Sequence, residues 1–492
     1  MKTKTIAEFR ESVLNGSVSI VERTHQILEE IKKQNKKFHH FNLISEKEAV
    51  EQAEQLEKRI KQEQKKQNQG ELKNLLLLGV PLSVKDSIIV KSVESRAGSA
   101  ILNGYIPLFD ATAVARAKQH GAITLGKTSQ DEFGFGAYSV NVGNGFEIPL
   151  NPLDEKRSTG GSSGGCAGFT TLTQFSHVSL AESTGGSAVF PASLCGCASI
   201  TPTYGRISRN GLIDFANSLD KISPMGKTIH EAAELLEAVA GFDENDSTSA
   251  EQPTEKFSSF AGKPIKGMKI GIISEFEKEG ILPPVQKAVS NAVSELEKQG
   301  AKTQKIFLPL NSEYAIPTYY LLATSEASTN LAKYCGMRYG ATERLEGNFN
   351  EYFSKVRSKN FGEEAKRRLL LGTFCRMSGF RDAYYLRALK VRQKMINEFQ
   401  QAFKKVDILV CPVASTIAPT FAEIKEWTPL QHYYADRMVN PPNVSGLPHA
   451  SVNVGEHQGM PIGLLLVANH WQETKLVQVA SAVEKPLRGD AK

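Results

Sequence analysis

The chain has 492 residues, of which 40% are hydrophobic and 23% charged, and its formal net charge is +6. This is ordinary globular composition, and so small a charge permits contact with a polyanion without demanding it. The opening residues, MKTKTIAEFRESVLNG, lack the apolar core of a signal peptide, and no stretch approaches the ~20 apolar residues of a membrane span. We therefore expect no membrane contact and a cytoplasmic location, with an organelle matrix as the alternative.

The N-terminal segment has the pattern of helices. Apolar residues recur along one side of residues 5–35, and residues 45–67 are rich in alanine, glutamate, lysine and glutamine. The sequence therefore predicts that residues 1–70 form a helical segment that packs on the core.

From residue 74 onward, short apolar runs alternate with helical patterns. The runs include LLLLGVPLSV (75–84), AITLGKT (122–128), SHVSLAES (176–183) and VDILVCP (406–412). Such alternation predicts an α/β protein with a mixed central β-sheet covered by helices. No internal repeat or interdomain linker interrupts the pattern. We therefore expect residues 71–492 to form a single large domain, in which the region 285–405 is more helical.

The six cysteines show no CxxC pair and no ligand-like spacing to histidine. Zinc sites built from cysteine and histidine use such closely spaced pairs. We therefore expect reduced, mostly buried thiols and no bound metal.

The stretch GAITLGKT, Gly121–Thr128, matches the phosphate-loop pattern G-x-x-x-x-G-K-[ST]. Such a loop needs an apolar strand before its first glycine. Here an amphipathic helix, ARAKQH, comes first, and AITL itself has the pattern of the strand. Backbone amides that are locked in a sheet cannot turn inward to hold a phosphate. The context therefore favours the end of a strand over a phosphate site.

The most unusual stretch is RSTGGSSGGCAG (157–168), which holds five glycines around two adjacent serines. It contains the pattern G-x-S-x-G of an α/β-hydrolase nucleophile elbow at Ser163. An elbow needs an apolar strand directly upstream, whereas NPLDEKRSTG is polar and contains a proline. Later histidines could complete a triad, so this alternative is disfavoured and stays open.

Two further segments lie on either side of this block. Upstream, GVPLSVKDSI places Lys85 directly after an apolar run, so its amine is expected near the interior; downstream, ESTGGSAVFPASLCG forms a second turn of glycine and serine. The three segments together offer one lysine and two serines on loops at the ends of buried elements. A glycine-rich packing loop explains each segment alone but not all three together.

In this order, GVPLSVKD, GGSSGG and STGGS resemble the motifs of the amidase-signature family, and the resemblance spans about residues 5–485. It implies an amidase-signature fold with a Ser–Ser–Lys triad. Lys85 would be the base, Ser162 the bridging serine with a cis peptide, and Ser187 the nucleophile. The amides of Thr184, Gly185, Gly186 and Ser187 would form the oxyanion hole.

The chemistry of such a triad is consistent. An isolated lysine titrates near ~10.4, but burial disfavours its charge and would leave the amine of Lys85 neutral. Ser162 would then relay a proton from Ser187, which attacks an amide carbonyl and forms an acyl-enzyme.

Other segments are similar to one branch of the family, the amidase (A) subunits of the tRNA-dependent amidotransferases that act on glutamyl-tRNA(Gln) or aspartyl-tRNA(Asn). They are 126–136, 202–225, 319–340, 361–374, 382–392 and 443–455. The resemblance implies that glutamine is hydrolysed and that ammonia passes to a B subunit, which activates the tRNA-bound residue with ATP. It therefore implies charged tRNA, a B subunit, and a small C subunit, all as partners. It implies no cofactor in this chain, with ATP and magnesium on the partner.

By their positions in these segments, Arg368 would hold the glutamine α-carboxylate, Asp436 its α-ammonium group, and Tyr319 would line the pocket. Guanidinium suits the first task because it can bind a carboxylate with two parallel hydrogen bonds. Two alternatives stay open, a free-standing amidase that hydrolyses a small amide and a catalytically weak scaffold subunit.

The nucleophile loop departs from the family pattern D-T-G-G-S-I-R. We expect Ser183 and Ala188 to replace its aspartate and arginine, and the spacing from Ser162 to Ser187 is one residue longer than usual. Joint loss of a charge pair leaves neither charge stranded. The sequence therefore predicts a loop that is braced without a salt bridge.

Overall fold

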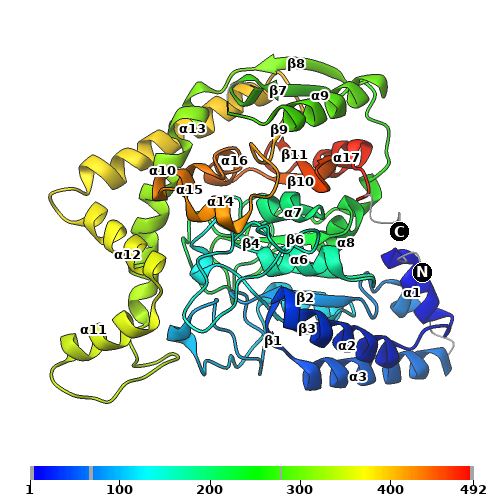
Figure 1. Cartoon of the computed structure of the whole chain (residues 1–492). Helices are drawn as coiled ribbons and strands as arrows, with labels where there is room; N and C mark the ends of the chain where they lie inside the picture. The colour runs from blue at the N-terminus through cyan, green and yellow to red at the C-terminus, as the bar shows by residue number, and fades with distance from the viewer. Residues whose placement is uncertain (1–4, 66–69, 278–279, 488–492) are drawn as a thin grey trace.

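The computed structural model describes residues 5–65, 70–277 and 280–487. One mixed β-sheet of eleven strands runs through this part of the chain, covered by helices (Figure 1). In spatial order the strands are β1 (Phe41–Ile44), β3 (Ile123–Thr128), β2 (Pro81–Lys85), β4 (Val178–Ser183), β6 (Lys221–Gly226), β5 (Ala198–Thr201), β10 (His449–His457), β11 (Met460–Ala468), β9 (Ile408–Pro412), β7 (Lys269–Ile273) and β8 (Lys302–Ile306). The predicted α/β class with a mixed central sheet is confirmed.

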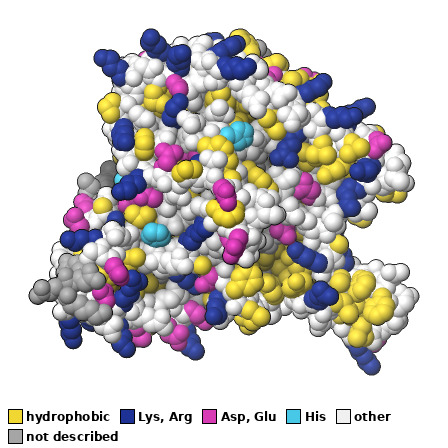
Figure 2. All heavy atoms as spheres, turned by 180° about the vertical axis from the view of Figure 1, so that it is seen from behind, with side chains coloured by type: hydrophobic (Ala, Val, Ile, Leu, Met, Phe, Trp, Pro, Cys, Tyr) yellow, Lys and Arg dark blue, Asp and Glu magenta, His cyan; other side chains and the backbone are white. Residues whose placement is uncertain are grey.

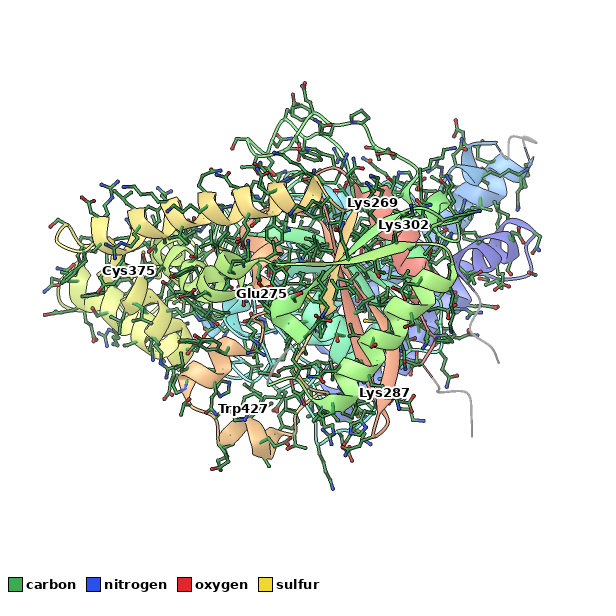
Figure 3. The ribbon with its side chains drawn as sticks, turned by 90° about the horizontal axis from the view of Figure 1, so that it is seen from above. Lys269, Glu275, Lys287, Lys302, Cys375 and Trp427 are labelled. Carbon is green, nitrogen blue, oxygen red and sulfur yellow. The ribbon has the colours of Figure 1, made fainter. Side chains whose placement is uncertain are left out.

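The central strands are buried on both faces, whereas the last edge strand is charged. Every residue of β2, β3, β4, β6 and β9 is buried, as expected for strands that read as apolar runs. Strand β8 instead exposes Lys302, which pairs with Lys269 at the start of β7 (Figure 3). Charged side chains on an edge strand oppose pairing with another chain.

The N-terminal segment forms three helices, α1 (Ile6–Leu14), α2 (Ile20–Phe38) and α3 (Glu46–Lys65). Helix α3 packs on strand β3, and α2 packs on α3. The pattern over 5–35 is therefore two helices, which Asn15 and Gly16 separate. The segment expected to be helical also contributes strand β1, which pairs antiparallel with β3. His39 ends α2 in the left-handed conformation and redirects the chain into the short run Phe-Asn-Leu-Ile. Residues 66 and 67 of the second expected helix lie outside the described part, and the boundary at residue 70 stays a prediction.

The stretch that matches a phosphate loop is strand β3, as its context predicts. Lys127 is fully buried, and its ammonium donates to the carbonyls of Asp86 and Ile88 and to Ser95 Oγ. The lysine therefore ties the end of β3 to the loop after β2 and is not available to a phosphate.

Long helices dominate the region after β7: α9 (Pro283–Lys298), α10 (Pro309–Asn330), α11 (Phe349–Asn360), α12 (Glu363–Arg376) and α13 (Arg387–Phe403). Helices α11, α12 and α13 project from the body of the molecule (Figure 1). The end of α12 and the turn after it expose several large apolar side chains, and the face seen from behind in Figure 2 shows hydrophobic groups on this projection. Helix α12 packs on α10, and this contact joins the projection to the rest of the molecule.

The remaining helices are α4 (Gly70–Lys73), α5 (Thr112–Gln119), α6 (Gly164–Leu172), α7 (Val189–Cys195), α8 (Ile229–Val239), α14 (Phe421–Lys425), α15 (Pro429–Tyr434), α16 (Asn440–Val444) and α17 (Glu473–Val483). Among the described residues, no helix combines the length and the apolar character that crossing a membrane requires.

Close packing of α12 on α10 depends on Gly372. A Cβ at this position would overlap the backbone carbonyl of Thr324, which belongs to α10. We predict that Gly372→Ala lowers the free energy of unfolding by about 1–3 kcal/mol, because the clash outweighs the better helix propensity of alanine. Urea unfolding measures the change. Gly379→Ala is the matched control, since its Cβ would meet no atom within 4 Å, and equal stability of the two variants would contradict the prediction.

Candidate active site

Lys85 ends strand β2 and is fully buried. Strands β2 and β4 are parallel, with Val84 opposite Leu180, so their carboxyl ends meet at one edge of the sheet. The Nζ atom of Lys85 lies 2.7 Å from Ser162 Oγ, 2.8 Å from Glu182 Oε2 and 3.1 Å from the carbonyl oxygen of Glu182. The structure thus brings the predicted base and the predicted bridging serine into hydrogen-bond contact.

The peptide bond between Gly161 and Ser162 is cis, as the family resemblance implies. The glycines of this block are required by close approach. A Cβ at Gly161 would overlap the Asp131 carboxylate and lie 2.6 Å from the Ser139 amide nitrogen. Only a bare backbone therefore fits between Asp131 and the bridging serine.

The α/β-hydrolase alternative at Ser163 is not supported. No strand leads into this serine, because residues 157–163 form a loop before α6. The hydroxyl of Ser163 is buried and donates to the carbonyl of Glu182 at 3.0 Å. Ser163 is therefore a structural residue that ties the loop to β4.

Ser187 lies in the turn between β4 and α7 and is 7% exposed. The amide of Ser163 donates to the carbonyl of Ser187 at 3.1 Å, so the two serine turns abut. Within the described chain, no hydrogen bond joins the hydroxyl of Ser187 to that of Ser162. The structure therefore places the turn of the predicted nucleophile against that of the bridging serine, without a hydrogen bond between the two hydroxyls in the described chain.

The glycines of this turn pack tightly on other elements. A Cβ at Gly185 would lie 2.6 Å from the ring of Tyr319, and one at Gly186 would overlap Val439. The amide of Gly186 donates to Ser183 Oγ at 3.1 Å. In the described part of the chain, the amides of Gly185 and Ser187 have no such acceptor.

The loop is braced without a salt bridge. Aligned letter by letter with D-T-G-G-S-I-R, the sequence STGGSAV places Val189, and not Ala188, at the position of the arginine, which corrects our assignment. Val189 is fully buried, and Ser183 Oγ lies 3.3 Å from Asn443 Oδ1. Apolar packing and hydrogen bonds thus replace the charge pair.

Glu182 contacts the predicted base, although no motif in the sequence pointed to it. Its buried carboxylate forms an ion pair with Lys85 and also accepts a hydrogen bond from Thr184 Oγ1 at 2.7 Å. The carboxylate thus gives the buried amine of Lys85 a partner of opposite charge. The available signal was an acidic residue at the end of an apolar strand, next to the serine–glycine turn.

A second carboxyl group lies behind Glu182. Asp220 Oδ1 is also 2.7 Å from Thr184 Oγ1. Burial, together with the charge of Glu182, raises the pKa of Asp220 well above its usual range. Strand β6 begins at the next residue and pairs with β4, which explains how this carboxyl group reaches the site.

The three residues expected to bind substrate come from separate elements. Tyr319 of α10 is buried against Gly185 of the nucleophile turn. Arg368 of α12 donates through Nε to Glu364 at 2.8 Å, and its two terminal nitrogens make no hydrogen bond within the described chain. Asp436 precedes α16, and its buried Oδ1 has no hydrogen-bond partner among the described residues. Burial raises the pKa of Asp436 to about 7.

A cavity of about 190 Å³ opens beside Arg368. Its wall includes aromatic residues from several elements, among them Trp427, which lies between α14 and α15 (Figure 3). The residues lining it are Gly136, Ala137, Tyr138, Val140, Asn141, Tyr320, Glu364, Arg367, Arg368, Trp427, Pro429, His432 and Tyr433. Arg368, the residue predicted to bind the glutamine α-carboxylate, therefore lines the cavity, whereas none of the three triad residues does.

Comparison with known proteins gives the class. The family model "Amidase" matches residues 22–477, so the chain belongs to the amidase family. The A subunit of the glutamyl-tRNA(Gln) amidotransferase of Heliobacterium modesticaldum is 39% identical over 483 residues, which cover 98% of this chain and 96% of that protein. The protein of the same name from Koribacter versatilis is 44% identical over 412 residues, or 84% and 85% of the two chains.

Solved structures agree with this assignment. The A subunit of the glutamyl-tRNA(Gln) amidotransferase of Thermotoga maritima matches with a TM-score of 0.76 and 28% identity, covering 100% of this chain and 98% of that chain. A peptide amidase of Stenotrophomonas maltophilia matches with a TM-score of 0.79 and 25% identity, over 99% of each chain. The predicted amidase-signature fold is confirmed.

The ion pair at the site predicts strong coupling between its two partners. Lys85→Met leaves the Glu182 carboxylate buried without its cation, which we expect to lower the free energy of unfolding by about 3–5 kcal/mol. In the double variant Lys85→Met/Glu182→Gln no charge is stranded, so the loss should be smaller than in Lys85→Met alone. Urea unfolding of the two single variants and the double variant measures the coupling. Losses that simply add would show that the pair does not interact.

Proposed function

We propose that this chain is the glutamine-hydrolysing component of a glutamyl-tRNA(Gln) amidotransferase, its A subunit, working through a Ser–Ser–Lys acyl-enzyme. The observation that carries the proposal is the 2.7 Å contact of Lys85 Nζ with Ser162 Oγ, next to the turn that holds Ser187. The nearly full-length similarity to A subunits supports the choice of this branch of the family.

In the proposed reaction, Ser187 Oγ attacks the side-chain amide carbon of glutamine. Its proton passes to Ser162, while the proton of Ser162 passes to the neutral amine of Lys85. The amides of Gly185 and Ser187 are available to stabilise the oxyanion, together with that of Thr184. The role proposed for Gly186 requires its amide to leave Ser183. Collapse of the intermediate transfers a proton back to the leaving nitrogen and releases ammonia, and water then hydrolyses the acyl-enzyme.

The proposed glutamine site binds the two charged groups on the α-carbon of glutamine with residues of opposite charge. Arg368 donates to Glu364 through Nε alone. Its two terminal nitrogens can therefore bind the α-carboxylate with two parallel hydrogen bonds. The unpartnered Oδ1 of Asp436 suits the α-ammonium group. Tyr319 contacts the nucleophile turn and would close the side of the pocket.

The proposal includes the rest of the complex. Ammonia would pass to a B subunit that uses ATP and magnesium to activate the tRNA-bound glutamate, and a further partner would be a small C subunit. This chain itself would carry no cofactor and would reach charged tRNA through the complex. An aspartyl-tRNA(Asn) substrate is the alternative, and a cytoplasmic location goes with either.

Trapping of the acyl-enzyme tests the proposal directly. An electrophilic glutamine analogue should label Ser187, and mass spectrometry of the digested protein identifies the modified serine. Ser187→Ala, Ser162→Ala and Lys85→Ala should each lower glutaminase activity by at least about 10³-fold, because the three groups act as a unit. Unchanged amide hydrolysis in all three would end the enzymatic interpretation. Turnover of simple amides without glutaminase activity would instead favour a free-standing amidase.

Glutamine affinity should depend on pH through Asp436. Because burial raises the pKa of this carboxyl to about 7, it is ionised at pH 8 and mostly neutral at pH 6, and only the ionised form attracts the α-ammonium group. We predict that KM for glutamine rises about tenfold per pH unit below 7. Initial rates over a range of glutamine concentrations at each pH check this. Asp436→Asn should raise KM and remove its pH dependence. A KM of the parental protein that stays constant from pH 8 to 5.5 would contradict the assignment.

A further inference from the structure

The amine of Lys85 has three partners, and two of them can only accept a hydrogen bond. These two are the carbonyl oxygen of Glu182, at 3.1 Å, and its carboxylate Oε2, at 2.8 Å. The third is the hydroxyl of Ser162, at 2.7 Å, which can either donate or accept. Glu182 therefore supplies two of the three polar contacts of Nζ, and Ser162 supplies the third.

A neutral amine carries two hydrogens and one lone pair. If both hydrogens point to the two oxygens of Glu182, the lone pair points to Ser162 Oγ, where the reaction needs it. We propose that Glu182 is a positioning residue that aims the lone pair of Lys85 at the bridging serine. The proposal rests on the function proposed above, since it concerns the same base.

The hydrogen bonds of Thr184 indicate which of two neighbouring carboxyl groups, Glu182 or Asp220, carries a proton. The hydroxyl of Thr184 has one hydrogen, yet it lies 2.7 Å from a carboxyl oxygen of both Glu182 and Asp220. One of these carboxyl groups must therefore carry a proton. Asp220 is the better candidate, because burial and the charge of Glu182 raise its pKa well above the usual range, whereas Glu182 has the amine of Lys85 at 2.8 Å. Two backbone amides donate to Asp220 Oδ2 at 2.9 Å, which leaves Oδ1 to carry the proton. Asp220 then donates to Thr184, and Thr184 donates to Glu182.

The charge of Glu182 has a second consequence. Its carboxylate lies 2.8 Å from Nζ and balances the positive charge that Lys85 acquires when it takes the proton of Ser162. Other titratable groups also act on this pair electrostatically from the surrounding elements. They are Asp131 in the loop after β3, Cys166 of α6, Asp220 before β6 and Tyr319 of α10. These four residues stay unchanged in the variants that test the proposal.

Two substitutions separate the aiming of the lone pair from the charge. Glu182→Gln keeps an acceptor for Nζ and loses the charge, and its amide nitrogen can donate to Thr184, whose hydroxyl then turns to Asp220. Glu182→Ala loses both the acceptor and the charge. Glu251→Gln, at an exposed position, is the matched control for the change of residue type.

The readout is glutaminase activity as a function of pH and glutamine concentration, measured on the full chain in its complex. In Glu182→Gln, kcat should stay within about threefold of the parental value, because the variant keeps a side-chain acceptor for Nζ. In Glu182→Ala, kcat should fall at least about tenfold at every pH while KM stays unchanged, because a misdirected base loses part of a general-base contribution of roughly 10²–10⁴-fold. Glu251→Gln should match the parental protein.

Two results would overturn the inference. One is a kcat of Glu182→Ala that stays within about threefold of the parental value. The other is an equal loss of kcat in both variants together with a lower melting temperature, which is the behaviour of a purely structural residue. Failure of the proposed function looks different, since the parental protein itself would then not be labelled at Ser187 by the glutamine analogue.

Discussion

A lysine amine without access to water is the constraint on which this site depends. Burying a charge is expensive unless the charge is paired and hydrogen-bonded, and Lys85 meets that condition with three contacts from Ser162 and Glu182. Two of the three come from the end of β4, which is parallel to β2. The pairing of β2 with β4 therefore both buries Lys85 and places Glu182 beside it. The turn that holds Ser187 begins directly after β4 ends.

The glycines around the site follow from how close the backbone segments must come. The bridging turn passes Asp131 with no space for a side chain, and the nucleophile turn does the same against Tyr319 and Val439. Tyr319 and Val439 belong to distant parts of the chain, yet both bear on residues next to Ser187. The packing of α10 and of the segment before α16 therefore also determines where the turn that holds Ser187 lies.

Much of this could be predicted from the sequence, because the motifs that carry the chemistry are local. The apolar run before Lys85 and the two glycine–serine turns each have a recognisable composition, and the context of Gly121–Thr128 was enough to predict a strand. What could not be predicted depends on contacts between distant residues. Asp220 enters the site only because β6 pairs with β4, and β1 forms only because the short run after α2 meets β3. No local pattern specifies either partner.

Glu182 illustrates the same limit on a smaller scale. Comparison with the pattern D-T-G-G-S-I-R directs attention to position 183, where the aspartate has become serine, and passes over the acidic residue one position earlier. In a strand, successive side chains point to opposite faces. The side chain at 183 faces Asn443 and the nucleophile turn, whereas the one at 182 faces Lys85. Placing the carboxylate one residue earlier therefore moves it from the side that braces the turn to the side that contacts the base.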